Sequence, residues 1–214
     1  MDRYSLTRAS GPSEEPITRN EAKLHLKVEA DQTSDDALID LLVSAAREDA
    51  EDFTNRCFCW STWELRLDEF PTNGNQEILL PRPPLIRVNS IQYVDADGVT
   101  QLLGSDNYQV DDKSEPARVR AAYGLSWPAT RAQMNAVTVS YVAGYPVSEA
   151  GSPADYAANV PAAAKAAVKL ILGHLYANRE TVMAMPGGVA AIEIPMGAKY
   201  LLWKLRVQDF RLGA

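Results

Sequence analysis

Cysteine and histidine are scarce in this sequence, and their placement excludes several kinds of site. Of the 214 residues, two are Cys and two are His. Cys57 and Cys59 are separated by one residue, so in an extended segment their side chains point to opposite faces and a mutual disulfide is unfavourable. This spacing is also tighter than that of paired zinc ligands. We therefore expect no metal site and two buried, reduced thiols, in a chain without a signal peptide that is made in a reducing cytoplasm.

Long apolar runs and an excess of positive charge are also missing. Lys165 and Lys169 interrupt the most hydrophobic segment, and no apolar run approaches the roughly 20 residues of a membrane span. We therefore expect a soluble protein with no membrane partner. The formal net charge is -7. Tight wrapping of nucleic acid needs Lys and Arg to release counterions, so an acidic chain is not expected to hold DNA. Acidic character instead lowers the affinity of a protein surface for phosphate groups.

The sequence also lacks the patterns that accompany catalysis. His25 and His174 fall in separate expected helices. A phosphate-binding glycine loop followed by Lys and Ser or Thr is absent, which argues against an ATPase of the P-loop type. Acidic residues are dense in 48–52, but adjacent acids on a helix do not converge on one point, and we expect them to form a solvated face. The sequence predicts no catalytic residue and no cofactor.

Helical periodicity occurs in two separate stretches, 17–60 and 159–205. The longer helices expected there carry apolar stripes, which are Leu38, Leu41, Leu42, Ala45 and Phe53 in the first stretch and Ala164, Val168, Ile171, Leu172 and Leu175 in the second. Burying each large aliphatic side chain contributes about 1.5–3 kcal/mol, so we expect the two stripes to pack together. A final helix is expected at Met196 to Leu205, with Leu201, Leu202 and Leu205 as its apolar core residues.

Helix starts are marked by short local patterns. Thr18 and Glu21 have the spacing of a capping box, in which each side chain satisfies a backbone N–H of the other residue. Ser34 is the expected N-cap of the longer helix that follows. Pro161 is expected at the first position of the helix after the strands, where its missing N–H costs nothing.

A strand-and-turn pattern occupies residues 61–147, between the two helical stretches. Apolar and charged residues alternate over 63–67, as in a half-buried strand. Asp97 and Gly98 between apolar runs indicate a hairpin, and β-branched and aromatic residues dominate 137–145. The sequence therefore predicts an α+β fold, with a helical core of about four helices and an inserted antiparallel β-rich unit.

Three further segments are not assigned to an expected helix or strand. Residues 1–16 have almost nothing to bury, and we expect a flexible N-terminal arm. Met183 to Gly188 is expected to be a loop. The terminal stretch 206–214 combines apolar anchors with arginines, as docking segments do, although packing back onto its own domain is the alternative. Its candidate docking residues are Arg206, Val207, Phe210, Arg211 and Leu212.

An ordered series of phrases resembles those of a known family. These phrases are WELRLDEFP from Trp63, LPRPPL from Leu80, Tyr93 to Thr100, Tyr123 to Pro128, and Val137 to Tyr145. Together they are similar to those of tailed-phage head–tail connector proteins. More narrowly, they resemble the gp6-like adaptor group, which gene transfer agents also carry. The similarity runs from about Ile17 to about Leu205.

The resemblance implies a structural virion protein and no enzymatic activity. Such a protein would form a ring of about twelve copies beneath the portal and extend the channel through which DNA passes without sequence-specific binding. Its partners would be further copies of itself, the portal protein, and a stopper or tail-completion protein. It would be located at the head–tail junction of the virion after assembly in the bacterial host cytoplasm. In connectors of this type the C-terminal end contacts the portal, which implies portal docking by residues 206–214.

Three alternatives remain open at the level of sequence. The chain is a neck or tail-completion protein at the next layer, a binding module outside any virion, or a small hydrolase with an unrecognised site. A hydrolase would need titratable groups that converge in a pocket.

Overall fold

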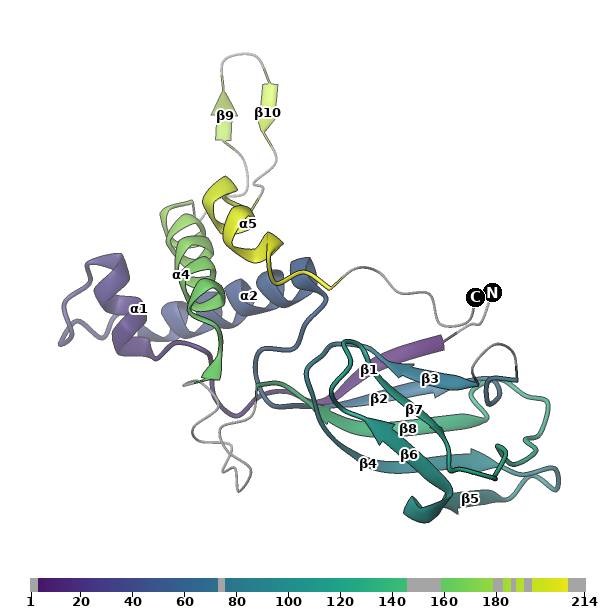
Figure 1. Ribbon diagram of the computed structural model, residues 1–214. Coiled ribbons are helices and arrows are strands. Elements are labelled where there is room, and N and C mark those ends of the chain that lie inside the picture. The colour runs from purple at the N-terminus through teal and green to yellow at the C-terminus, as the bar shows by residue number, and fades with distance from the viewer. Residues whose placement is uncertain are drawn as a thin grey trace.

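The computed structural model describes residues 4–72, 76–145, 159–178, 183–185, 188–190 and 194–207. Four helices lie within these residues, and they are α1 (Arg19–Leu26), α2 (Asp36–Thr54), α4 (Ala162–Ala177) and α5 (Met196–Trp203). The helices gather at one end of the molecule and most strands at the other (Figure 1). The predicted α+β fold, with antiparallel strands inserted between two helical stretches, is confirmed. None of the helices in this described part is both long and apolar enough to cross a membrane.

The β unit consists of two antiparallel sheets that share one core. Its strands are β1 (Tyr4–Ser10), β2 (Ser61–Leu67), β3 (Glu77–Leu80), β4 (Leu85–Val94), β5 (Thr100–Leu103), β6 (Tyr108–Asp111), β7 (Ala117–Ala121) and β8 (Val137–Ala143). One sheet has the order β1-β2-β8-β4-β5, and the other has the order β3-β7-β6. Buried side chains from both sheets form a single hydrophobic cluster.

Alternation along the strands explains this shared core. On β2, Trp63, Leu65 and Leu67 are buried, and the residues between them are only half-buried. Because successive strand side chains point to opposite faces, one face of β2 packs inward, as predicted. The predicted hairpin between β4 and β5 is also confirmed. Gly98 has φ +88° there, and the Asp95 carboxylate accepts a hydrogen bond of 2.9 Å from the Val99 N–H.

The N-terminal segment differs from the expected flexible arm. Tyr4–Ser10 forms β1, which pairs antiparallel with β2, Tyr4 lying opposite Leu67. The composition of the segment suggested that it buries too little apolar surface to offset the conformational entropy lost when it becomes ordered. It does not fold alone, because β2 supplies its hydrogen-bond partners and the Arg8 guanidinium lies 4.7 Å from the centre of the Trp63 ring.

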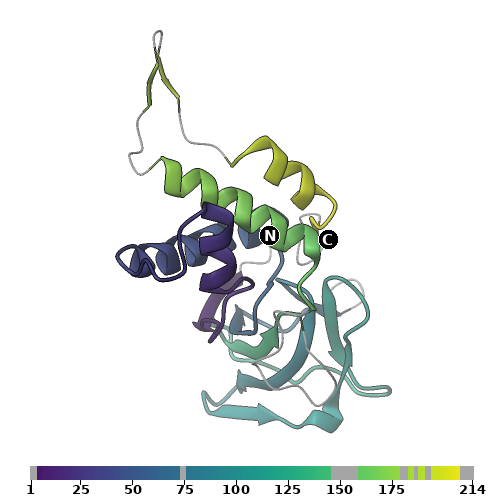
Figure 2. The same ribbon diagram turned by 90° about the vertical axis from the view of Figure 1, so that its left-hand side faces the viewer.

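The helical unit has its own hydrophobic cluster, separate from that of the sheets. In both views α4 lies between α1 on one side and α5 on the other (Figures 1 and 2). The predicted pairing of the long helices is confirmed, because α2 and α4 pack together. On α4, the predicted stripe is buried at Ala164, Val168, Ile171 and Leu172, and Leu175 is partly buried.

The apolar stripe predicted for α2 is only partly correct, because Leu42 and Phe53 pack against the core but the centre of the buried face is rotated about the helix axis. Leu41 is 66% exposed, and the residues that enter the core are Ile39, Val43, Ala46 and Ala50. The first half of α2 is apolar around most of its circumference, so helical spacing alone permits either set. The position of α4 selects the buried one.

Local capping patterns were predicted with mixed success. The capping box of α1 is confirmed, with the Thr18 N–H donating to Glu21 at 2.9 Å and the Glu21 N–H donating to the Thr18 hydroxyl at 3.2 Å. The N-cap of α2 is Asp35 rather than Ser34. The Asp35 carboxylate accepts a hydrogen bond of 2.6 Å from the Tyr176 hydroxyl on α4, a contact that local sequence does not reveal.

The segment expected to be a loop between α4 and α5 contains a strand pair. β9 (Met183–Met185) and β10 (Gly188–Ala190) pair antiparallel and extend away from the helices (Figures 1 and 2). Pro186 and Gly187, which joined the loop prediction, lie outside the described residues.

Candidate functional site

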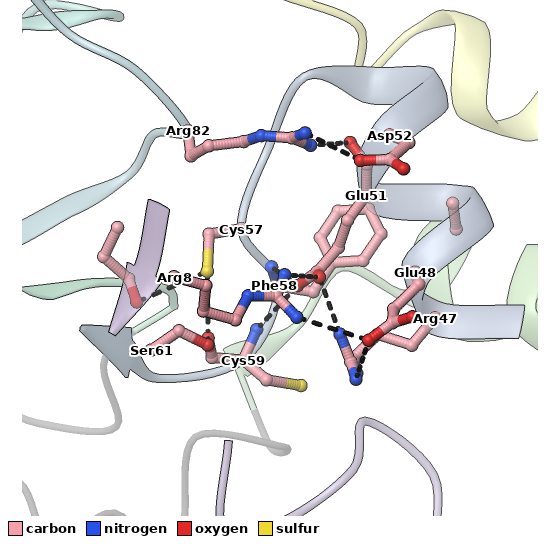
Figure 3. A network of polar contacts seen from close by, with 12 residues as sticks. Arg8, Arg47, Glu48, Glu51, Asp52, Cys57, Phe58, Cys59, Ser61 and Arg82 are labelled. Carbon is pink, nitrogen blue, oxygen red and sulfur yellow. Dashed lines mark hydrogen bonds and ion pairs between the residues drawn. The ribbon is translucent and has the colours of Figure 1, made fainter. Parts of the chain in front are cut away.

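A buried ionic network joins the helical unit to the β unit. Its centre is Glu51 on α2, which is 1% exposed. One carboxylate oxygen accepts hydrogen bonds from Arg47 at 2.8 Å and from Arg8 of β1 at 2.7 Å. The other oxygen accepts hydrogen bonds from the backbone N–H groups of Phe58, at 2.7 Å, and Cys59, at 3.4 Å, in the link to β2 (Figure 3). Three separate segments are therefore held by one side chain.

Glu51 corrects the expectation of a solvated acidic face. The sequence reads as two adjacent acidic pairs, and only their placement against the following segment distinguishes them. Glu48 has a side chain that is 56% exposed, and that of Asp52 is 72% exposed, as expected. Glu51 is turned inward because the chain after α2 folds back over it. No local pattern signals this burial, although a carboxylate one helical turn after Arg47 is consistent with pairing.

Electrostatics favour the charged state of Arg47. Arg47 is 2% exposed, and it also donates to Glu15 at 2.7 Å. Burial by itself disfavours the charge of Arg47, but Glu51 and Glu15 outweigh it and raise the pKa of Arg47 above its ordinary value. A buried charge pair of this kind is costly to break because the remaining partner loses its compensation.

Two further contacts brace the same junction from the β unit. Arg82, in the turn between β3 and β4, donates to the backbone carbonyl of Glu51 at 3.0 Å and to Asp52 at 2.7 Å. Its guanidinium also lies 5.6 Å from the centre of the Trp63 ring. The orientation of the sheets relative to α2 is therefore set by several charge-assisted contacts.

The two cysteines are structural at this junction. Both are free and fully buried, which confirms the prediction of buried reduced thiols. Burial, together with the Glu51 charge, raises the pKa of Cys57 to about 12 and raises that of Cys59 as well. The nucleophilic form of either thiol is therefore disfavoured. In the described part of the chain, no three His, Cys, Asp or Glu side chains are arranged to hold a metal ion.

The candidate docking residues fall into two groups. Val207 is 8% exposed, and its N–H donates to the Thr54 carbonyl at 2.9 Å, so it attaches the end of α5 to α2. Arg206 is exposed and stacks near the rings of Phe53 and Trp203, at 5.9 and 5.7 Å. Phe210, Arg211 and Leu212 lie outside the described residues.

Next to Arg206, one face of α5 is apolar and exposed. Met196 is 87% exposed, Tyr200 69% and Trp203 65%, and their spacing places them on one side of the helix. Aromatic residues and arginine are the types that dominate protein interfaces. From Ile194 to Val207 the chain has three basic residues and no acidic one. We call Met196, Tyr200, Trp203 and Arg206 the α5 face. Sequence reasoning assigned this helix to the core through Leu201, Leu202 and Leu205 and missed its outer side.

Among the described residues, the β unit has a polar depression that is open to solvent. It is lined by Gln76, Gln109, Arg120 and Tyr123, among others. Tyr123 is 98% exposed, so it does not enclose the depression. No histidine, cysteine or carboxylate lines it, and the arrangement offers no acid–base pair.

Comparison with solved structures shows that this fold recurs in gene transfer agents (GTAs). A chain in the virion of a native GTA particle is similar over 97% of this chain and 98% of that chain, with a TM-score of 0.73 and 21% identity. Chains from two GTA necks also match over 98% of both chains. The neck of an empty particle, computed with C6 symmetry, gives a TM-score of 0.73 at 20% identity. The neck of a native particle, computed with C12 symmetry, gives 0.70 at 19%.

The shared fold therefore covers nearly the whole chain. No protein-family model matches the sequence, and no curated protein sequence matches it.

Proposed function

We propose that this chain is a structural neck protein of a phage-like particle, an adaptor that forms a ring beneath the portal. The observation that carries the proposal is the likeness, over 98% of both chains, to a chain in a GTA neck computed with C12 symmetry. The ordered sequence phrases that resemble head–tail connectors support it independently. A ring of about twelve copies would extend the DNA channel and join head to tail. The chain acts by shape and catalyses no reaction.

The geometry of the chain suits this role. Head-to-tail contacts close into a ring only when each subunit repeats the same rotation. A subunit made of two units must therefore hold them at one angle, and the Glu51 network supplies that constraint. The net charge of -7 suits a channel wall that releases DNA rather than binding it.

The C-terminal segment is the proposed portal-docking element. Val207 attaches the start of the segment to α2, and Arg206 extends the α5 face next to it. Phe210, Arg211 and Leu212 then provide the anchors for the portal. Truncation after Val207 preserves the attachment to Thr54 and removes these anchors, so the truncated chain should fold but fail to join portal rings.

Mixing the purified chain with portal rings tests the proposal. We expect native mass spectrometry to show a complex with a fixed number of copies per portal, and electron microscopy to show an added ring around the same axis. A chain that stays monomeric at every ratio and leaves the portal mass unchanged would overturn the adaptor assignment. Binding to tail-side proteins in place of the portal would identify a neck or tail-completion protein at the next layer.

A further inference from the structure

The five-stranded sheet ends in two open edges. β1 pairs only with β2 and β5 pairs only with β4 among the described strands, so the outer edge of each has a row of unpaired backbone groups. The two edges lie on opposite sides of the same sheet (Figure 1). One subunit therefore has two different strand edges that face away from each other.

Protection of these edges against pairing with another chain is limited to the shortness of β5, the register shift at the end of β1 and the one charged residue of β1, Arg8. Natural edge strands are commonly blocked by Lys, Pro or inward-pointing charges. β5 contains no charged residue and no Pro, and its Leu102 is 68% exposed. On β1 the only charged residue is Arg8, which is occupied by Glu51. The single register shift of β1 lies between Arg8 and Ser10, so Tyr4 to Arg8 remains regular.

Strand direction determines which pairing can propagate. Every step from β1 through β2, β8 and β4 to β5 is antiparallel, so β5 runs in the same direction as β1. Copies related by rotation about a ring axis would therefore place β5 parallel to the β1 of the next copy. A two-fold contact of β1 with β1, or of β5 with β5, would be antiparallel and would stop at a dimer.

Side chains on the two edges are compatible across such a junction. On the face of the sheet away from the core, β1 presents Ser5 and Thr7, and β5 presents Thr100 and Leu102. All four are exposed and none is charged. Cross-strand pairs of hydroxyl and apolar residues stabilise sheets, and like charges would have opposed the contact.

We propose that β5 of one copy pairs with β1 of the next, head to tail, so that the five-stranded sheet continues from subunit to subunit around the ring. This inference rests on the proposed ring function and names the contact that closes the ring. β5 has only four residues, so each contact is short. Free subunits should therefore remain monomeric, and the ring should form where the portal gathers many copies together.

Disulfide trapping on portal-bound rings tests the contact directly. The native Cys57 and Cys59 are fully buried and should form no disulfides between subunits, so any covalent oligomer can be assigned to the engineered cysteines. We expect Leu102→Cys combined with Ser5→Cys, or with Thr7→Cys, to give a ladder of covalent oligomers beyond the dimer after mild oxidation. Leu102→Cys alone should give no ladder. The matched control combines Leu102→Cys with Gln109→Cys on β6, an exposed edge residue of the other sheet, and should also give none.

A charge on the edge provides a second measurement. Leu102→Lys should leave the urea midpoint of the monomer unchanged and reduce ring formation on the portal at least about 10-fold, because edge lysines oppose strand addition. Gln109→Lys should assemble normally. Portal complexes of normal mass that show neither the ladder nor sensitivity to Leu102→Lys would overturn edge pairing and leave the adaptor function intact. Absence of any portal complex with the unmodified chain would instead contradict the adaptor function itself.

Discussion

The helical unit and the β unit reach buried cores by different means. Small residues are prominent where the helices meet, and they are Ala22, Ala46, Ala50, Ala164, Ala167 and Ala198. The sheet core relies on larger side chains, among them Trp63, Phe70 and Tyr141. Small residues allow helices to approach closely, and stacked sheets lie about 10 Å apart and need bulk to fill that space. The two units therefore respond differently to substitution, and a polar junction connects them.

The outer surfaces of the two units differ in the same way. The helical unit exposes the side chains of the α5 face. The β unit exposes unpaired backbone groups along the outer edges of β1 and β5. Side-chain surfaces suit a partner with matching pockets, whereas strand edges suit a partner with a strand of its own. The adaptor that we propose would contact both a portal and its own copies, and the two units offer a different kind of surface for each contact.

Breaking the junction should have the largest effect. Glu51→Ala leaves the buried Arg47 without its buried counter-charge, and we expect a loss of about 3–5 kcal/mol in the free energy of unfolding, measured by urea titration. The control is Glu64→Ala, which removes a half-exposed partner of Arg66 and should cost at most about 1 kcal/mol. Equal losses in the two variants would show that the junction does not hold the units together.

Equivalent deletions in the two cores test whether the units unfold together. Leu65 on β2 and Leu172 on α4 are both fully buried, and each change to Ala should cost about 2–5 kcal/mol. Because the Glu51 network couples the units, we expect one transition that shifts equally by fluorescence and by far-ultraviolet circular dichroism. Two transitions, with each variant shifting only one, would show independent units. Leu24→Ala, at a position 80% exposed, serves as the control.

Gly144 tests how tightly the end of β8 approaches the junction. Its φ is +136°, and an added Cβ would lie 2.8 Å from the backbone carbonyl carbon of Cys59. We expect Gly144→Ala to cost more than about 1 kcal/mol, measured by thermal and urea unfolding. Gly11→Ala, where nothing lies within 4 Å of the added atom, should change stability little. A neutral Gly144→Ala would mean that the link can shift away from β8.

The smallest effect is expected at the start of α1. Thr18→Ala removes one half of the capping box at an exposed position and should cost about 0.5–1 kcal/mol. Thr18→Ser keeps the hydroxyl and should restore most of the loss. If both variants were equally destabilised, the methyl group rather than the cap would be responsible.

Periodic patterns explain which features were predicted from the sequence. The alternation over 63–67 and the stripe on α4 each permit only one buried face, so both were predicted correctly. On α2, two apolar sets compete, and Leu41 was assigned to the core although it is 66% exposed. The strand β1 was missed because its stability comes from pairing with β2, more than 50 residues away in the sequence.

The candidate site was less predictable than the fold. Glu51 appears in the sequence as one acid among several, and its role follows from the segment that folds over it. The docking residues beyond Val207 remain a prediction. Val207 was included with them because apolar residues near a terminus resemble anchors, but in the structure it packs against its own helix α2.

By itself, the sequence determined most of the helices and strands, the boundaries between the larger helical and strand regions, and the inward face of most strands, because side-chain periodicity and capping are local properties. Tertiary structure alone decided the pairing of β1, the buried face of α2, the inward turn of Glu51 and the exposure of the α5 face. Each of these depends on contacts between segments far apart in the chain, where hydrogen-bond partners and buried area come from the distant segment.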